Sequence, residues 1–419
     1  MKKVIGKKWE IGLSSKENHY LCSMKVLYLI RRCAPLDGAA RTLLRLIESN
    51  PSVEAHVACR YRFGHIDSVA VTEVDSCAAM QKVIADGGYD IIHYFRTSGY
   101  ELFDWAVKAL KRLRLDTPII TTICQRPSYP QLLPSPAELT RSVRVVMIDR
   151  AAMNDPLFDF VATDRKKHIY FGATQRDIDL TGRLAASWQP TPGRVVFGRG
   201  STPGKVPADY CRITDRITTP GKHVIIAGIP SGSSVRRQAE GRDYVEMVDA
   251  LPYDEWLKLC NGFDVFLYYL PKDGHSSIDG TLGQAMMLGK PVVYYGPAAP
   301  AERLVHGVNG FIAGKPSEIP EYCDRLGADA ELRRRMGTSA RQSTITDFSM
   351  AACVRRYNAL YKEVLNEVHS GHKLIPVKVP ISYHKYFARC AWRSWLRSRL
   401  AGSMIERLSH RIKPLPERT

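Results

Sequence analysis

Short runs of apolar and β-branched residues alternate along the chain with longer segments whose apolar positions recur at helical spacing. Strands are predicted at residues 24–30, 90–95, 118–124, 144–148, 194–197, 223–229, 264–270 and 291–295. An alternation of short strands with helices is typical of βαβ units, which build parallel sheets covered by helices. The pattern therefore predicts an α/β fold.

The strand series pauses between residues 171 and 193, in a polar stretch bounded by Gly- and Pro-containing turns. Each half of the chain also begins with a strand that runs into a Gly-containing loop. We therefore expect two Rossmann-like, doubly wound domains that face each other across a cleft, with ligands at the carboxyl ends of the strands. The expected parts are an N-terminal extension at residues 1–23, an N-terminal domain at 24–190 and a C-terminal domain at 191–345.

The chain carries an excess of positive charge, formally +18, over 419 residues of which 45% are hydrophobic. A chain of this length exceeds what one core usually organises, which agrees with two domains. The charge predicts an anionic partner: nucleic acid, a membrane surface or a phosphorylated substrate. Residues 371–419 hold eleven of the bases against two acids, so this tail concentrates the excess.

Targeting and redox features are few. No run of eighteen uncharged apolar residues occurs, and the basic N-terminus lacks the apolar stretch of a signal peptide, so a cytoplasmic location is expected. The ten cysteines include no Cys-x-x-Cys pair and lie mostly in apolar segments. This spacing predicts reduced thiols, with neither disulfides nor zinc.

The segment between residues 264 and 313 carries the most specific signal. A strand is followed by a polar loop, by the run Leu282-Gly-Gln-Ala-Met-Met-Leu-Gly-Lys-Pro-Val-Val, and by Glu302-Arg-Leu-Val-His-Gly-Val-Asn-Gly. This segment resembles the donor-binding segment of family 4 retaining glycosyltransferases, which have the two-domain GT-B architecture. The alternative is an ordinary helix-to-strand turn of any Rossmann-like protein. The resemblance covers most of residues 24–366 and implies that the last helix, within 346–370, crosses back to the first domain.

The resemblance implies that a nucleotide-sugar, UDP- or GDP-linked, is the co-substrate, with no further cofactor. In the family, two glutamates with seven residues between them hold the sugar and the ribose; here Ser276 and Gln284 occupy their places. The amide of Gln284 can still accept and donate a hydrogen bond, whereas Ser276 is too short to replace a carboxylate. Asp279 is a candidate for the missing charge, or a turn former. Ser277, Thr281 and Leu282 complete the expected donor loop and helix start.

Two cations are expected at the donor phosphates. Arg199 and Lys205 follow the first strand of the second half, in a segment that resembles the family's Gly-Arg strand end. They would neutralise a pyrophosphate and make a divalent metal unnecessary, unless they are merely a solvated pair in a turn. Gly38 lies where the family has a Gly-rich loop near the phosphates, and Val248 lies in the stretch that presents backbone groups to the base.

Acceptor-side candidates follow strands of the first half. His93 ends the strand at 90–95, where the family's acceptor side opens; its alternative role is that of a core histidine. Gln125, Arg126 and Ser128 follow the strand at 118–124 and lie at the correct edge of the sheet to contact acceptor or sugar.

Bases at positions 385, 389, 393 and 397 recur at helical spacing beside Phe387, Trp392 and Trp395. This pattern is typical of an interfacial helix on an anionic bilayer, with packing on the first domain or nucleic-acid binding as alternatives. We therefore expect a glycosyltransferase of polysaccharide biosynthesis that acts on a lipid-linked or surface-polysaccharide acceptor, peripheral on the inner face of the cell membrane. A nucleotide-sugar epimerase and a catalytically silent nucleotide-sugar-binding protein are the alternatives.

Overall fold

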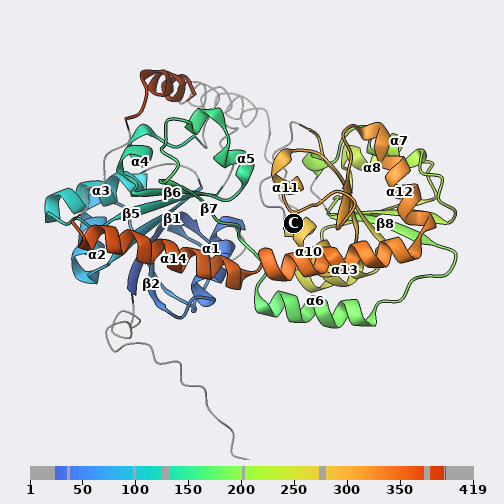
Figure 1. Ribbon diagram of the computed structural model, residues 1–419, viewed down its shortest axis with the longest axis horizontal. Helices are drawn as coiled ribbons and strands as arrows, with labels where there is room; N and C mark the ends of the chain where they lie inside the picture. The colour runs from blue at the N-terminus through green and yellow to red at the C-terminus, as the bar shows by residue number, and fades with distance from the viewer. Residues whose placement is uncertain are drawn as a thin grey trace, which may run out of the picture.

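The computed structural model describes residues 24–34, 38–97, 101–124, 133–200, 203–272, 280–371, 378–390 and 392. It contains two domains side by side, each a parallel sheet between layers of helices (Figure 1). The predicted α/β class with two doubly wound domains is confirmed. All eight predicted strands are present, with ends that differ by no more than three residues.

The N-terminal sheet has the strand order β3-β2-β1-β4-β5-β6-β7 and is parallel throughout. Its strands are β1 (Met24–Cys33), β2 (Val53–Arg62), β3 (Ala70–Glu73), β4 (Ile91–Arg96), β5 (Ile119–Ile123), β6 (Arg144–Met147) and β7 (Lys166–His168). The helices are α1 (Gly38–Glu48), α2 (Cys77–Gly87), α3 (Glu101–Leu113), α4 (Pro136–Arg141), α5 (Arg150–Met153) and the 3₁₀ turn η3 (Pro156–Phe158).

Alternate residues of β1 enter two different cores. Val26, Tyr28 and Ile30 pack against α1 and α14 (Met350–His369), whereas Leu27 and Leu29 pack against α2 and α3. Because a strand covered on both faces buries every side chain, β1 is an almost continuous apolar run. The same burial explains why the central strands were predictable from the sequence.

The C-terminal sheet has the order β10-β9-β8-β11-β12-β13 and is also parallel. Its strands are β8 (Val195–Gly200), β9 (Lys222–Ala227), β10 (Val245–Val248), β11 (Val265–Tyr269), β12 (Val292–Tyr295) and β13 (Gly310–Ile312). Its helices and 3₁₀ turns are η4 (Pro203–Lys205), α7 (Tyr210–Asp215), α8 (Ser234–Ala239), α9 (Tyr253–Asn261), α10 (Gly280–Met287), α11 (Ala298–Ala301), η5 (Pro316–Glu318), α12 (Ile319–Ala328) and α13 (Ala330–Asp347).

The chain passes between the domains twice, at neighbouring points. Ala173, in the first connection, forms a β-bridge with Ser349, in the connection that returns to the N-terminal domain. A Cβ on Gly172 would lie 2.1 Å from the carbonyl oxygen of Phe348. Glycine at position 172 is therefore required by the close approach of the two connections. The helix α6 (Gln175–Ser187), which the predicted boundary assigns to the first domain, packs against α9 and α10 of the second.

The return crossing leads into α14, which lies along the N-terminal domain (Figure 1). The Ser349 hydroxyl caps this helix by accepting the backbone N–H of Ala352 at 3.2 Å. Cys353, Tyr357 and Tyr361 then place one face of the helix in the N-terminal core. Residues from both ends of the chain thus complete one domain.

Part of the basic tail packs on the N-terminal domain through a helix at residues 381–390. The Tyr383 hydroxyl donates to the carbonyl oxygen of Pro134 at 2.8 Å, Cys390 is buried, and Phe387 packs against the same core. Phe387 is therefore not available as a bilayer anchor in this arrangement. The opposite side of the helix carries Lys385 and Arg389, while Trp395 lies outside the described residues. No described helix has the length and apolar character needed to cross a membrane.

Candidate functional site

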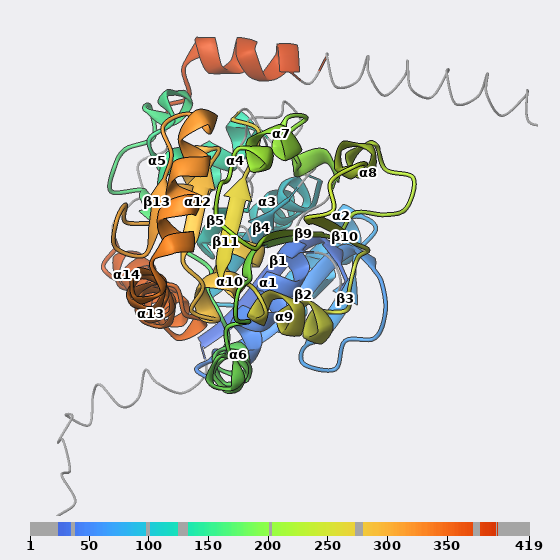
Figure 2. The same cartoon turned by 90° about the vertical axis from the view of Figure 1, so that its right-hand side faces the viewer.

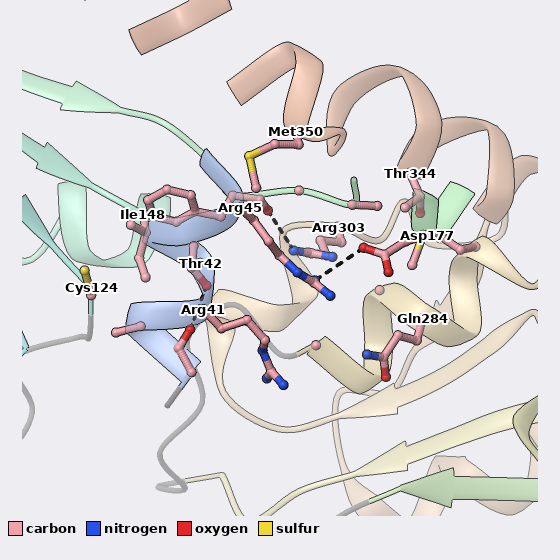
Figure 3. A pocket seen from close by; sticks show the side chains of 18 of the residues that line it. Arg41, Thr42, Arg45, Cys124, Ile148, Asp177, Gln284, Arg303, Thr344 and Met350 are labelled. Carbon is pink, nitrogen blue, oxygen red and sulfur yellow. Dashed lines mark hydrogen bonds and ion pairs between the residues drawn. The ribbon is translucent and has the colours of Figure 1, made fainter. Parts of the chain in front are cut away.

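A pocket of about 430 Å³ lies between the two domains, where the amino ends of α1 and α10 meet (Figure 3). Gly38 of α1 and Gly280 of α10 line it together with the crossing residues Gly172 and Ala173. A helix amino end carries partial positive charge and is a favourable environment for an anion. The pocket therefore sits where two such ends, one from each domain, reinforce each other.

The described lining of the pocket is strongly basic. Arg41 and Arg45 enter from α1, and Lys205 and Arg303 from the second domain, whereas Asp177 is the one carboxylate among the described lining residues. Figure 3 shows Arg41 extending from α1 toward the pocket. An excess of cations in a partly enclosed space favours a ligand with more than one negative charge.

Asp177 joins three parts of the chain at one side of the pocket. Its Oδ2 lies 3.3 Å from Nη1 of Arg45, and its Oδ1 accepts the Tyr253 hydroxyl at 2.7 Å. The same carboxylate forms a capping box with Thr174 at the start of α6. Burial and the neighbouring Asp177 charge raise the pKa of Tyr253, so this phenol stays protonated and donates. Asp177 is thereby saturated by protein groups.

Arg303 is held against the crossing point and is 8% exposed. Its Nη2 donates to the carbonyl oxygen of Phe171 at 3.3 Å, and its guanidinium lies 5.1 Å from the ring centroid of Phe348. A Cβ on Gly283 would approach Nη1 of Arg303 to 2.4 Å. The absence of a side chain on Gly283 therefore lets this cation reach the first turns of α10.

Neighbouring Glu302 fastens the two domains together. Its carboxylate accepts the backbone N–H groups of Arg150 and Ala151 and the hydroxyl of Tyr170, each at 2.7 Å. All three donors belong to the N-terminal domain, whereas Glu302 follows α11 of the second. This contact holds the pocket walls at their present separation.

Gln284 lines the pocket, and its amide oxygen already accepts one hydrogen bond. Nε1 of Trp256 donates to that oxygen at 2.7 Å, which leaves the second lone pair of the oxygen and the NH₂ group for a ligand. The role of Gln284 in ribose binding stays a prediction. Thr281 is the second residue of the same helix, and the side chain of Leu282 is fully buried, so Leu282 offers only its backbone.

The two expected phosphate-binding cations have different positions. Lys205 lines the pocket, but Arg199 is fully buried and does not. Nη1 of Arg199 donates to the carbonyl oxygen of Tyr269 at 2.6 Å, and Nη2 donates to that of Lys205 at 3.2 Å. The expectation of a pair of cations at the pocket mouth is corrected: Arg199 supports the turn that carries Lys205.

His93 belongs to the N-terminal core. It is fully buried, and its ring nitrogens share hydrogen bonds with the hydroxyls of Tyr361, at 2.6 Å from Nδ1, and Thr122, at 2.7 Å from Nε2. Burial lowers the pKa of His93 to about 3, so the ring is neutral. It does not line the pocket, and this geometry favours the core-histidine alternative over a catalytic role.

The remaining expected residues divide into two groups. Gly38 lines the pocket, whereas the carbonyl oxygen of Val248 accepts the N–H groups of Gly228 and Ile229 and does not line it. Six others lie outside the described residues: Ser276, Ser277, Asp279, Gln125, Arg126 and Ser128.

Sequence reasoning did not find most of the cationic lining. Arg45 has the position of an ordinary helix-surface residue in the sequence, and Arg303 is distinguished only as part of the motif at residues 302–310. The sequence does place Arg41 and Arg45 four residues apart, on one face of the helix that begins at Gly38 after β1. This spacing could have indicated that both cations face the same site. Within the described residues, no group of three or more His, Cys, Asp or Glu side chains is placed to hold a metal ion. The nine described cysteines are free thiols.

Comparisons with known proteins identify the architecture. No protein-family model and no curated protein matches the chain. Several solved structures do: HepE of Anabaena in complex with UDP (17% identity, TM-score 0.62, 81% of this chain and 100% of that one), a glycosyltransferase of Rickettsia africae (13%, 0.63, 82% and 99%) and sucrose-phosphate synthase of Thermosynechococcus elongatus (15%, 0.60, 82% and 99%). The fold is therefore that of the GT-B glycosyltransferases.

Proposed function

We propose that this protein is a glycosyltransferase, similar to family 4, that binds a nucleotide-sugar in the pocket between its domains. The observation that carries the proposal is the convergence of the amino ends of α1 and α10 with Arg41, Lys205 and Arg303 on one pocket. A nucleoside diphosphate matches this arrangement because its two phosphates can contact both helix ends at once. Its charge is then balanced by side chains of both domains.

The expected chemistry is transfer of the sugar with departure of the nucleoside diphosphate. Negative charge grows on the leaving phosphate as the bond between the anomeric carbon of the sugar and the phosphate oxygen breaks and the acceptor oxygen bonds to that carbon. Fixed cations and N–H groups stabilise the charge on the leaving phosphate. We propose that Lys205 and Arg303 serve the phosphates directly. They would allow turnover without a divalent metal, and the test is activity after chelation. Activity that is abolished by a chelator and restored by magnesium or manganese would contradict this part.

The test of the function begins with nucleotide binding. UDP, which HepE holds in its solved structure, is the first nucleotide to titrate calorimetrically, followed by GDP. UDP- and GDP-sugars are then screened for release of the nucleoside diphosphate with and without glycan acceptors, and NMR of the anomeric proton distinguishes retention from inversion. Nucleotide binding without turnover on any donor would favour the silent binder. Conversion of the donor to an epimer would favour the epimerase.

We further propose that the acceptor is lipid-linked or part of a surface polysaccharide, and that the protein acts at the cytoplasmic face of the membrane. Support comes from the outward side of the helix at 381–390. Lys385 and Arg389 lie there beside exposed Ile381 and Tyr386, and Trp392 follows, 60% exposed. Bases next to exposed apolar side chains favour an anionic bilayer surface.

A further inference from the structure

A second basic surface lies at the carboxyl edge of the N-terminal sheet. β1 and β2 end side by side there: Arg32 is in register with Tyr61, and the N–H of Phe63 donates to the carbonyl oxygen of Cys33 at 2.9 Å. Gly38, which lines the pocket, begins the helix that follows β1. The carboxyl ends of both strands therefore lie at the sheet edge from which the chain leads to α1, although no described residue of either strand lines the pocket itself.

Aromatic and guanidinium groups alternate on this edge, and we call Arg31, Arg32, Arg60, Tyr61 and Phe63 the arginine–aromatic surface. The guanidinium of Arg32 lies 5.1 Å from the Phe63 ring centroid, and that of Arg60 lies 5.4 Å from the Tyr61 centroid. Tyr61 is 40% exposed and Phe63 47%. Two large rings exposed together at a strand end are unusual for a surface that contacts only water.

Positive charge on this surface is only partly compensated. Arg31 pairs with Glu101 at 2.8 Å, and Glu73 accepts the backbone N–H of Arg62. Arg32 and Arg60 form no ion pair with a carboxylate of the described residues. Nη1 of Arg60 donates to the carbonyl oxygen of Val74 at 3.4 Å, and the Arg60 guanidinium also lies 5.6 Å from the Trp105 ring centroid. Guanidinium groups without an acidic partner are suited to bind a carboxylate or a phosphate through paired N–H donors.

We infer that the arginine–aromatic surface binds the acceptor, and that this acceptor is an anionic saccharide bearing a carboxylate or a phosphate. The inference rests on the proposed function and adds the chemical class of the acceptor. Tyr61 and Phe63 offer flat apolar faces for the C–H face of sugar rings, while Arg32 and Arg60 bind the anionic group. A saccharide held there lies on the same sheet edge as the donor pocket.

The test compares three trisaccharides of equal length, one with carboxylates, one with a phosphate and one neutral, titrated into the full chain. We expect both anionic sugars to bind more tightly than the neutral one, and the tighter of the two identifies the anion. Arg32→Gln combined with Arg60→Gln should weaken anionic binding by about tenfold and leave the neutral sugar unchanged, because the charge-assisted contact with the anionic group is lost. Phe63→Ser should weaken binding of all three.

Arg335→Gln is the matched control, since Arg335 is an exposed arginine of α13 in the other domain. Thermal melting of each variant verifies folding. Equal binding of anionic and neutral sugars, or an Arg32/Arg60 variant that behaves like the control, would overturn the inference. So would tighter binding of a single-stranded oligonucleotide than of any sugar. UDP titration separates the two proposals. If the parent chain does not bind UDP, the proposed function is contradicted. The preference for anionic over neutral sugars is measured independently of UDP and tests only the acceptor inference.

Discussion

Arg45 of the N-terminal domain forms a 3.3 Å ion pair with Asp177, which completes the capping box of the first helix after the crossing. The side chain of Asp177 is 5% exposed, whereas the side chain of Arg45 is 31% exposed. The two partners therefore have unequal importance. Asp177 also accepts the Tyr253 hydroxyl and completes the helix cap, whereas Arg45 contacts the same carboxylate and the same tyrosine from the more exposed side.

We expect Arg45→Ala to lower the free energy of unfolding by less than about 1 kcal/mol, since one partner is well hydrated. Asp177→Ala should cost about 1–3 kcal/mol, because the Tyr253 hydroxyl and the cap lose their acceptor. Urea unfolding of both variants measures the difference. Equal losses would show that the ion pair, and not the cap and the tyrosine, dominates the contribution of Asp177.

Lys205 and Arg199 should separate function from stability. Lys205→Ala is expected to cost about 2–4 kcal/mol of transition-state stabilisation with little change in unfolding, because the side chain lines the pocket. Arg199→Ala should destabilise the domain by about 1–3 kcal/mol or more, since two carbonyl oxygens lose their donors. Turnover assays and thermal melting of each variant provide the comparison. Unchanged donor affinity and turnover in Lys205→Ala would remove this residue from the phosphate site.

The hydrogen bond between Trp256 and Gln284 predicts the effect of placing a carboxylate at position 284. Gln284→Glu retains one oxygen for Nε1 of Trp256 and gains another acceptor, so it should bind nucleotide several-fold more tightly through its ribose hydroxyls. Titration of UDP and of its 2′-deoxy analogue into the parent and the variant measures this. A gain that persists with the deoxy analogue would place the new contact away from the 2′-hydroxyl.

His93 predicts a pH-dependent stability. The folded state keeps its pKa near 3, whereas the unfolded chain has the ordinary value near 6.5, so below about pH 6.5 the unfolded state binds the extra proton. The contribution is fully present above pH 6.5 and falls by about 1.4 kcal/mol per pH unit toward pH 3. His93→Gln should flatten this slope in denaturant melts at pH 7.5, 6.0 and 5.0. An unchanged slope would assign the pH dependence to other groups.

The tail helix predicts salt-sensitive membrane binding. Lys385→Glu with Arg389→Glu should release the chain from anionic vesicles, because attraction of about 1 kcal/mol per base becomes repulsion. Sedimentation with anionic and neutral vesicles, at low and high salt, measures the effect, and Arg335→Gln again serves as control. Unlike a truncation near Ser370, this variant keeps Tyr383 and its contact with Pro134. Equal sedimentation of the variant and the parent chain would favour packing as the sole role of this helix.

The sequence by itself determined the fold class and the central strands of both sheets. A strand such as β4, buried on both faces, has a continuous apolar signal that local composition reveals. β2 and β3, which carry polar residues at many positions, were not predicted. Edge and near-edge strands lie partly in solvent, so their composition does not distinguish them from loops. The donor segment was recognised because its motif is continuous along the chain.

Tertiary structure alone decided which side chains reach the pocket. Arg199 and Lys205 are six residues apart, yet Arg199 is fully buried and Lys205 lines the pocket. The reason is that Arg199 lies within the strand β8, whereas Lys205 lies in the 3₁₀ turn η4 that follows it. His93 faces the core because α14, more than 250 residues later, covers that side of the sheet. Arg45 and Arg303 meet the same pocket only because the chain crosses between domains twice. Contacts between segments far apart in sequence depend on packing of the whole chain, and no local pattern encodes them.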